Sequence, residues 1–311
     1  MKPAESSKSN LIAPVHRLAR PTIRSRMSVL QRRKARQAVM FGLTGASLVL
    51  TIGFLALLLG FVARRALPVM SWEFISQMPR RGMTEGGILP AILGTVYLVA
   101  GSVSVASILG TATAIYLTEY AQQGPIVKFI RAGVNNLAGV PSVVFGLFGL
   151  AVFVKLFGLG VSILSGSLTL AVVILPTIIR SAEEALLAVP KSYREASLAL
   201  GATKWQTVRY AVLPSAIPGI LTGCILAVSR AAGETAPIML TAATFFTARL
   251  PQSMLDEVQA LAYHIFALVT EGTHPEAQKP IAFGAAFVLL AIVILLNLSA
   301  IIIRAQHGKK E

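Results

Sequence analysis

The sequence predicts an all-α polytopic membrane protein with six transmembrane helices. Of its 311 residues, 55% are hydrophobic and only 13% are charged, a balance outside the range of soluble globular domains. Runs of about 20 apolar residues, the length that crosses a bilayer as a helix, recur along the chain. The formal net charge of +15 therefore fits basic residues facing the anionic lipids of a membrane, rather than a nucleic-acid partner.

Six segments have the length and composition of spanning helices. Their approximate bounds are 39–62, 91–117, 137–154, 168–179, 216–243 and 281–303. The first is longer than the apolar core of a signal peptide and no small-residue cleavage pattern follows it, so we expect an uncleaved anchor. The fourth is short, and we expect Pro176 to break it.

Lys and Arg are distributed unevenly between the predicted loops. With the N-terminus inside, about 20 lie on the cytoplasmic side and about 7 outside, which sets the orientation. Residues 1–38 then form a basic, disordered cytoplasmic tail, because they are too polar and proline-rich to bury a core. Residues 39–304 form the membrane domain, with a cytoplasmic loop at 180–214, and residues 305–311 form a second cytoplasmic tail. The loop 245–280 falls outside.

The sequence lacks the motifs that are typical of several classes of protein. The chain has no Gly-x4-Gly-Lys-Ser/Thr loop, so it cannot cradle ATP phosphates itself. It has no His-Glu-x2-His, Cys-x2-Cys or Gly-x-Ser-x-Gly pattern, and the single Cys224 excludes an intrachain disulfide. Polar residues that could catalyse a reaction inside the spans are few. We therefore expect no catalytic residue, metal or cofactor in this chain, which leaves transport or scaffolding.

The polar stretch from Ser192 to Pro214, here called the docking unit, lies between two apolar spans. Ser192 and Glu195 have the spacing of a capping box, Gly201 suits a helix end, and Thr203 suits a second helix start. We therefore expect two short helices at the cytoplasmic face. The side chains available to press into a partner are Ala196, Leu198, Ala199 and Leu200.

The docking unit resembles the EAA motif of ABC-transporter permeases, Glu-Ala-Ala-x3-Gly-x9-Ile-x-Leu-Pro. It departs from the motif at Ser197, which replaces the second alanine, and at Ala211, which replaces the isoleucine. The resemblance implies the type I, MetI-like permease architecture, in which this loop is a coupling helix that docks into a separate ATPase subunit. The coupling residues it implies are Glu195, Ala196, Ser197, Leu200, Gly201, Leu213 and Pro214.

Longer segments resemble the PstA-type permease subunits of phosphate-importing ABC transporters. They are GGILPAILGTVYL (86–98), LAGVPSVVFGLFGL (137–150), SRAAGETAPIMLTAA (229–243) and LLNLSAIIIR (295–304). The Gly-Glu-Thr-Ala-Pro run favours PstA over its sibling PstC. The resemblance implies phosphate import in the bacterial cytoplasmic (inner) membrane with both termini in the cytoplasm. It also implies three partners: a PstC-type permease, a PstB-type ATPase dimer that binds ATP and Mg, and an outer PstS-type binding protein.

Arg230 and Glu234 are the charges predicted to lie within a span. They are four residues apart, so on one helix they share a face and can pair. A charge at the bilayer centre costs on the order of 2.5–3.5 kcal/mol and persists where it is paired or lines an aqueous path. We interpret Arg230 as contacting an oxyanion in transit, with Glu234 holding it and Thr235 adding a hydroxyl group. The alternative is a salt bridge that only orients the span.

Arg180 lies at the inner end of the fourth span, where it either forms part of an inner gate or extends to lipid phosphates. Gly219-x3-Gly223 predicts close helix packing in the fifth span. Other functions stay open: a PstC-type subunit, a permease for another oxyanion, an ATP-independent carrier or channel, or a membrane scaffold. The EAA-like register argues against the carrier, and a scaffold does not need the Arg230–Glu234 pair.

Overall fold

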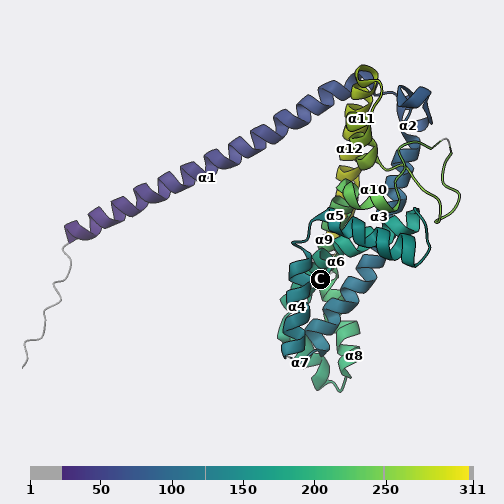
Figure 1. Cartoon of the computed structure of the whole chain (residues 1–311). Helices are drawn as coiled ribbons and strands as arrows, with labels where there is room; N and C mark the ends of the chain where they lie inside the picture. The colour runs from purple at the N-terminus through teal and green to yellow at the C-terminus, as the bar shows by residue number, and fades with distance from the viewer. Residues whose placement is uncertain (1–22, 123, 248, 308–311) are drawn as a thin grey trace, which may run out of the picture. The chain divides into compact units, whose positions relative to one another are not determined.

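A computed structural model describes residues 23–122, 124–247 and 249–307 of the chain (Figure 1). The chain divides into two compact units, residues 1–59 and residues 60–311, and each is described by itself. The described structure is almost entirely helical, as the sequence predicts.

Unit 1 consists, in its described part, of the helix α1 (Ile23–Ala66), which continues across the unit boundary. This helix begins well before the predicted span at Val39, so residues 23–38 are helical rather than disordered. The last proline of the tail is Pro21, and the Gln-Arg-Arg-Lys-Ala-Arg-Gln run from Gln31 consists of good helix formers. Residues 1–22 of the predicted tail lie outside the described residues.

Five helices among the described residues are long and apolar enough to cross a bilayer. Besides α1 they are built on α3 (Leu89–Ile115), α6 (Ile163–Ala188), α9 (Leu213–Gly233) and α12 (Pro275–His307). The helix α3 continues into the π-helical segment η3 (Tyr116–Tyr120). The helix α8 (Lys204–Thr207) runs through the π-helical η5 (Val208–Val212) into α9, so that residues 204–233 form one helical segment. These helices match the first, second, fourth, fifth and sixth predicted spans.

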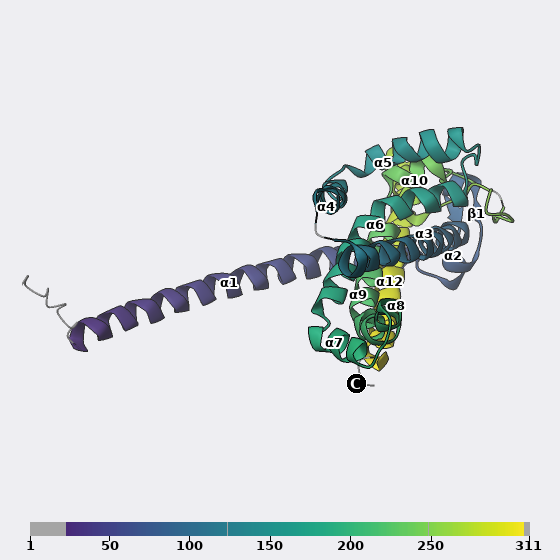
Figure 2. The same ribbon diagram turned by 90° about the horizontal axis from the view of Figure 1, so that it is seen from below.

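The third predicted span is one arm of a bent helix pair, whose other arm lies in the loop predicted before it. The helix α4 (Pro125–Leu137) is followed by α5 (Ser142–Gly149) and the π-helical η4 (Leu150–Leu156), and the two arms meet at 104°. Figure 2 shows α4 end-on and α5 from the side. Pro141 lacks an N–H and disfavours the helical conformation of the residue before it, which explains a break at this point. The count is six spans when the bent pair is taken as one.

The fourth predicted span is longer than expected and is not broken by proline. The helix α6 continues through Pro176 and ends at Ala188 rather than Ile179. Ile174 and Ile178 beside Pro176 are buried in the main core cluster. A Cβ atom on Gly110 of α3 would lie 2.7 Å from Ile178, so the two helices approach closely. This packing stabilises the helix despite the hydrogen bond that proline removes.

The remaining elements of unit 2 are short. They are η1 (Leu67–Val69), α2 (Trp72–Ser76), β1 (Pro79–Arg80), η2 (Arg81–Met83), β2 (Glu85–Gly86), α7 (Lys191–Ala199), α10 (Ala236–Thr241) and α11 (Leu261–Thr270). The strands β1 and β2 pair antiparallel. Within unit 2, α2 lies at one end and α7 and α8 lie at the other (Figure 1). The predicted outer loop 245–280 contains the buried helix α11.

The core of unit 2 lies where α3, α6 and α9 cross, and α5 and α10 pack beside them (Figure 2). Many of its side chains are small, such as Ala106, Ala171, Ala227 and Ala231. Without a hydrophobic driving force between helices in lipid, small residues let the backbones approach and gain van der Waals contact. The tight crossing of α6 and α9 positions the cavity described next.

Candidate functional site

A cavity of about 540 Å³ lies between α6, α9 and the break that follows α4. Two cations, Arg180 of α6 and Arg230 of α9, line it together. The other polar side chains in its wall are Thr177, Ser181, Glu184 and Thr222. Two of the residues that the sequence singled out thus meet in one cavity, although the sequence placed them on different spans.

Arg180 and Arg230 are held in different ways. The Nε atom of Arg180 donates a hydrogen bond to Oδ1 of Asn135 on α4, at 2.9 Å. The Nε atom of Arg230 lies 3.5 Å from Oε1 of Glu234, and the Arg230 side chain is 37% exposed. These are the only side-chain partners of either guanidinium among the described residues, so both retain N–H donors that can bind a ligand.

Glu234 pairs with Arg230, but not through a shared helix face. The helix α9 ends at Gly233, and Glu234 has extended backbone angles (φ −73°, ψ 132°). The predicted fifth span therefore ends before Ala243. Glycine has low helix propensity, and Pro237, in the first turn of α10, has no N–H to donate to the Gly233 carbonyl, which together explain the break.

Glu234 and Thr235 do not line the cavity shared by Arg180 and Arg230. Glu234 instead borders a much smaller void between α3, α9 and α10. Thr235 is the residue that precedes α10, and its carbonyl oxygen accepts a hydrogen bond from the N–H of Met239. Among the four residues predicted to contact a substrate, Arg180 and Arg230 therefore lie in the cavity, and Glu234 reaches it only through Arg230.

Glycines of α9 set the width of the cavity. A Cβ atom on Gly219 would lie 2.5 Å from Cβ of Ala185, and one on Gly223 would collide with Ser181. The predicted packing role of Gly219-x3-Gly223 is confirmed. Because α6 and α9 touch here, Arg180 and Arg230 line the same cavity, one on each helix.

The sequence prediction missed Glu184, which is the carboxylate in the cavity wall. A signal was present, because Thr177, Arg180, Ser181 and Glu184 have the spacing i, i+3, i+4, i+7 of one helix face. The predicted fourth span stopped at Ile179, which hid this polar face. The wall holds two guanidinium groups and one carboxylate, and Glu234 offsets part of the charge of Arg230 from outside it, so the remaining N–H donors suit an anion.

The docking unit forms two helices, as predicted, but the first has no capping box. Helix α7 begins at Lys191, and Pro190 precedes it with no side-chain cap, so Ser192 and Glu195 lie inside the first two turns. The predicted helix end at Gly201 is confirmed. Gly201 has φ +82°, and its N–H donates to the Leu198 carbonyl at 3.0 Å. The N–H of Ala202 donates to the Ser197 carbonyl at 3.3 Å, which completes a Schellman motif.

The second helix begins at Thr203, as predicted. Its hydroxyl accepts from the N–H of Gln206, and the Gln206 side chain accepts from the N–H of Thr203, which forms a capping box. The helix does not end at Pro214. Proline cannot donate a backbone hydrogen bond, and the π-helical turn η5 directly before it changes the hydrogen-bond register, so the helix continues into α9. Leu213 and Pro214 therefore lie within a helix that extends to Gly233.

The side chains expected to contact a partner are exposed on α7. Glu195, Ala196 and Leu198 are accessible, and Leu200 is 88% exposed. Ser197 is partly buried instead, and its Oγ lies 3.0 Å from Oγ1 of Thr207. The docking helix α7 thus presents an outer surface that combines Glu195 with apolar side chains, while Ser197 joins it to the helix that continues into α9.

The sequence matches a family described as "Binding-protein-dependent transport system inner membrane component" over residues 110–310. The chain belongs to this family. Its docking unit and its cavity both lie inside the matched region, so the resemblance to ABC-transporter permeases is confirmed.

Relatives of this permease are similar over nearly their whole length. A "Probable ABC transporter permease protein YqgI" of Bacillus subtilis is 33% identical over 86% of this chain and 95% of that protein. A "Phosphate transport system permease protein PstA 2" of Mycobacterium bovis is 34% identical over 87% of this chain and 88% of that protein. A structure of the MetNI methionine ABC transporter aligns with a TM-score of 0.58, at 18% identity, over 71% of this chain and 95% of that one. The last match confirms the MetI-like permease fold.

Proposed function

We propose that this permease is the PstA-type subunit of an ATP-driven importer of inorganic phosphate. The observation that carries the proposal is the cavity in which Arg180 and Arg230 converge from two packed helices. Relatives named as phosphate permeases, similar over most of the chain, support the choice of substrate. The same cavity chemistry also suits other tetrahedral oxyanions, so uptake experiments must decide the substrate.

Different residues of the cavity contribute to binding and to release of the anion. Phosphate carries about one to two negative charges near neutral pH. A guanidinium group offers planar, paired N–H donors that match two oxygens of such an anion. Arg230 and Arg180 bind the anion from opposite walls, and Glu234 orients Arg230 from the end of α9. Glu184 offsets part of the positive charge, so that the anion is bound weakly enough to leave.

Transport needs partners that this chain does not contain. A PstC-type permease completes the path, and a PstS-type protein delivers phosphate at the outer end of unit 2. A PstB-type ATPase dimer docks on the opposite end, where it contacts the exposed residues of α7. The ATPase binds ATP and Mg and performs the hydrolysis, and this chain contributes no catalytic residue. The complex resides in the bacterial inner membrane, with both termini of this chain in the cytoplasm.

ATP-driven closure of the ATPase changes which side the cavity faces. A partner can drive such a change only when it binds the two conformations with different affinities. Movement of the docking unit reaches Arg230 directly, because residues 204–233 form one helical segment. Pro214 and Arg230 lie about 24 Å apart along it, at about 1.5 Å per residue.

Reconstitution tests the proposed substrate. The permease is purified with its second permease, ATPase and binding protein, placed in liposomes with ATP, and supplied with labelled phosphate. We expect ATP-dependent uptake that arsenate inhibits, because arsenate matches phosphate in shape and charge, and that sulfate inhibits weakly. Uptake that a sulfate excess abolishes while arsenate does not would overturn the phosphate assignment.

A further inference from the structure

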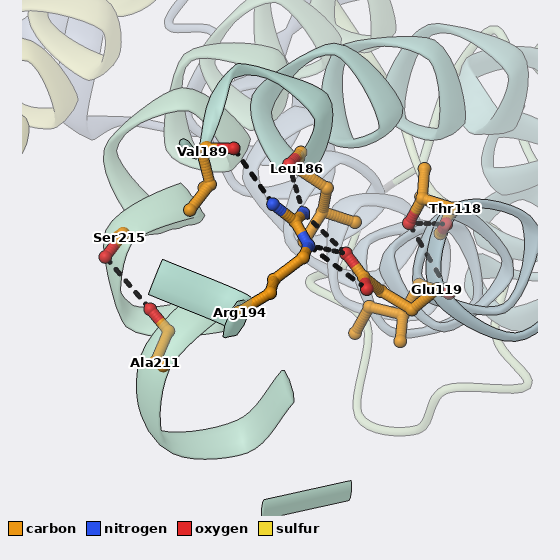
Figure 3. A network of polar contacts seen from close by, with 9 residues as sticks. Thr118, Glu119, Leu186, Val189, Arg194, Ala211 and Ser215 are labelled. Carbon is orange, nitrogen blue, oxygen red and sulfur yellow. Dashed lines mark hydrogen bonds and ion pairs between the residues drawn. The ribbon is translucent and has the colours of Figure 1, made fainter. Parts of the chain in front are cut away.

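Arg194, in the middle of the docking helix α7, contacts the ends of two other helical segments at once (Figure 3). Its Nη2 atom lies 2.6 Å from Oε1 of Glu119, and its Nε atom lies 3.1 and 3.3 Å from the two Glu119 oxygens. Nη2 also donates to the Leu186 carbonyl at 2.8 Å, and Nη1 donates to the Val189 carbonyl at 2.9 Å. Glu119 belongs to η3 at the end of α3, and both carbonyls lie at the end of α6.

This arrangement satisfies groups that would otherwise lack partners. The last carbonyls of a helix have no intrahelical donor, and a cation near a helix C-terminus also interacts favourably with the helix dipole. The Glu119 side chain is 9% exposed and the Arg194 side chain 21%. Among the ion pairs between described residues, it is the shortest and the most buried. A pair this protected is held in place, whereas exposed pairs contribute little.

The clamp formed by Arg194, Glu119 and the two carbonyls lies next to the docking surface. Glu195, the following residue, is exposed on the outer side of α7. On the other side, Leu186 lies about 9 Å along α6 from Arg180 in the cavity wall. The Ser197–Thr207 contact ties the same short helix to the segment that carries Arg230. The docking helix is thereby attached to both walls of the cavity, to α6 by a two-residue link and the Arg194 contacts, and to α9 by the chain and the Ser197 contact. It reaches the end of α3 through the Arg194–Glu119 ion pair.

We propose that the Arg194–Glu119 clamp transmits displacement of the docking helix to α3 and α6, and that Arg194 and Glu119 are positioning residues for coupling ATP hydrolysis to transport. The proposal rests on the importer function above. During the transport cycle α7 and the ends of α3 and α6 move as one body. Without the clamp, an ATPase partner moves α7 with the chain segments on either side of it, while the end of α3 stays behind and the end of α6 follows only through its two-residue link.

The first test measures transported phosphate per ATP hydrolysed in the reconstituted complex. Glu119→Gln keeps the side-chain shape but removes the charge, and Arg194→Lys keeps the charge but removes the planar fork. We expect both variants to co-purify with the ATPase and to hydrolyse ATP, with transport per ATP reduced at least tenfold. The control Lys279→Ala breaks an exposed ion pair with Glu276 and leaves the ratio unchanged. A wild-type ratio in both clamp variants overturns the proposal.

The second test compares the same protein sample before cross-linking, after cross-linking and after reduction, so that a folding defect cannot explain a difference. Arg194 and Glu119 are both replaced by cysteine in a Cys224→Ser background, and a short, reductively cleavable thiol cross-linker joins them. The clamp proposal expects a low transport-per-ATP ratio that rises severalfold on cross-linking and falls again on reduction. Transport that is blocked by the cross-link shows that the two helices separate during the cycle, which overturns the proposal. Failure of the phosphate assignment is distinguishable, because the unmodified complex would then not transport phosphate at all.

Discussion

Two arginines, one in the docking unit and one in the cavity, show how acceptors decide what a guanidinium does. Arg194 has a buried carboxylate and two carbonyl oxygens within hydrogen-bond distance. Among the described residues, Arg230 has one charged side-chain partner, Oε1 of Glu234 at 3.5 Å, and its side chain borders a cavity. A guanidinium whose donors are occupied holds helices together, whereas one with donors left over can bind a ligand.

The two arginines lie at opposite ends of one proposed mechanism. Arg194, whose donors are occupied, lies where a partner would apply force. Arg230, which has donors left over, lies where a substrate would pass. The helix α6 joins them, because it contributes two carbonyls to the Arg194 clamp and Arg180 to the cavity. The two regions therefore make opposite demands on the same helix: rigidity at its end and adaptable binding in its middle.

The largest expected effect is that of Arg230→Gln. A hydrogen bond to a charged group contributes about 1.5–3 kcal/mol, so the loss of this cation weakens anion binding by roughly 10- to 100-fold. We expect phosphate uptake by the reconstituted complex to fall to background while assembly and the Arg194 clamp stay intact. Lys279→Gln is the matched control, since it removes an exposed cation away from the cavity. Normal uptake by the Arg230 variant would erase the distinction between the two arginines.

A smaller effect of opposite sign is expected for Glu184→Gln. This change removes the carboxylate from the cavity wall and leaves both cations, so the anion binds more tightly and leaves more slowly. A change of about 1 kcal/mol corresponds to roughly fivefold in affinity. Uptake measured against phosphate concentration should show a lower KM and a lower maximal rate. A raised KM would instead mean that Glu184 is protonated and donates a hydrogen bond to the substrate.

Much of this fold could be predicted from the sequence, because length and apolar content determine where a chain crosses a bilayer. The predictions were wrong where tertiary packing or a single backbone position determined whether a helix continues or ends. Close contact with α3 keeps α6 helical through Pro176, and Gly233 ends α9 before Glu234. The helix α4, in a loop of the prediction, forms an additional arm that meets the third predicted span at 104°.

The site was only partly predictable. The position of Arg230 inside an apolar span marked it as functional. Helical spacing would also have indicated Glu184 if the predicted fourth span had extended to the observed end of α6. Nothing in the sequence distinguished Arg194 from the other arginines of the cytoplasmic loop. Its role depends on Glu119, which is distant in sequence, and on carbonyl groups, which every residue carries. Such contacts appear only when helix ends are placed in space.

Gly201 allows a test of whether the end of α7 contributes to docking. Its φ of +82° disfavours residues with a Cβ, and no atom lies within 4 Å of an added Cβ, so only the backbone conformation is at stake. We expect Gly201→Ala to cost about 1–2 kcal/mol at the end of α7 and to weaken ATPase co-purification severalfold. Gly201→Asn should retain most of it, because asparagine tolerates this conformation. Equal co-purification of both variants with the unmodified permease would mean that the end of α7 does not contribute to docking.

The smallest expected effect concerns the hydroxyl contact that joins α7 to the helix continuing into α9. Thr207 is buried, so Ser197→Ala leaves its hydroxyl without this partner, and Thr207→Val does the same to Ser197. A neutral hydrogen bond contributes about 0.5–1.5 kcal/mol, and a double-mutant cycle isolates it. Thermal unfolding in detergent should show the double variant less destabilised than the sum of the singles by about this amount. Strict additivity would mean that α7 is attached to the α9 wall by the chain alone, which would leave the Arg194 clamp as the main side-chain link between docking and transport.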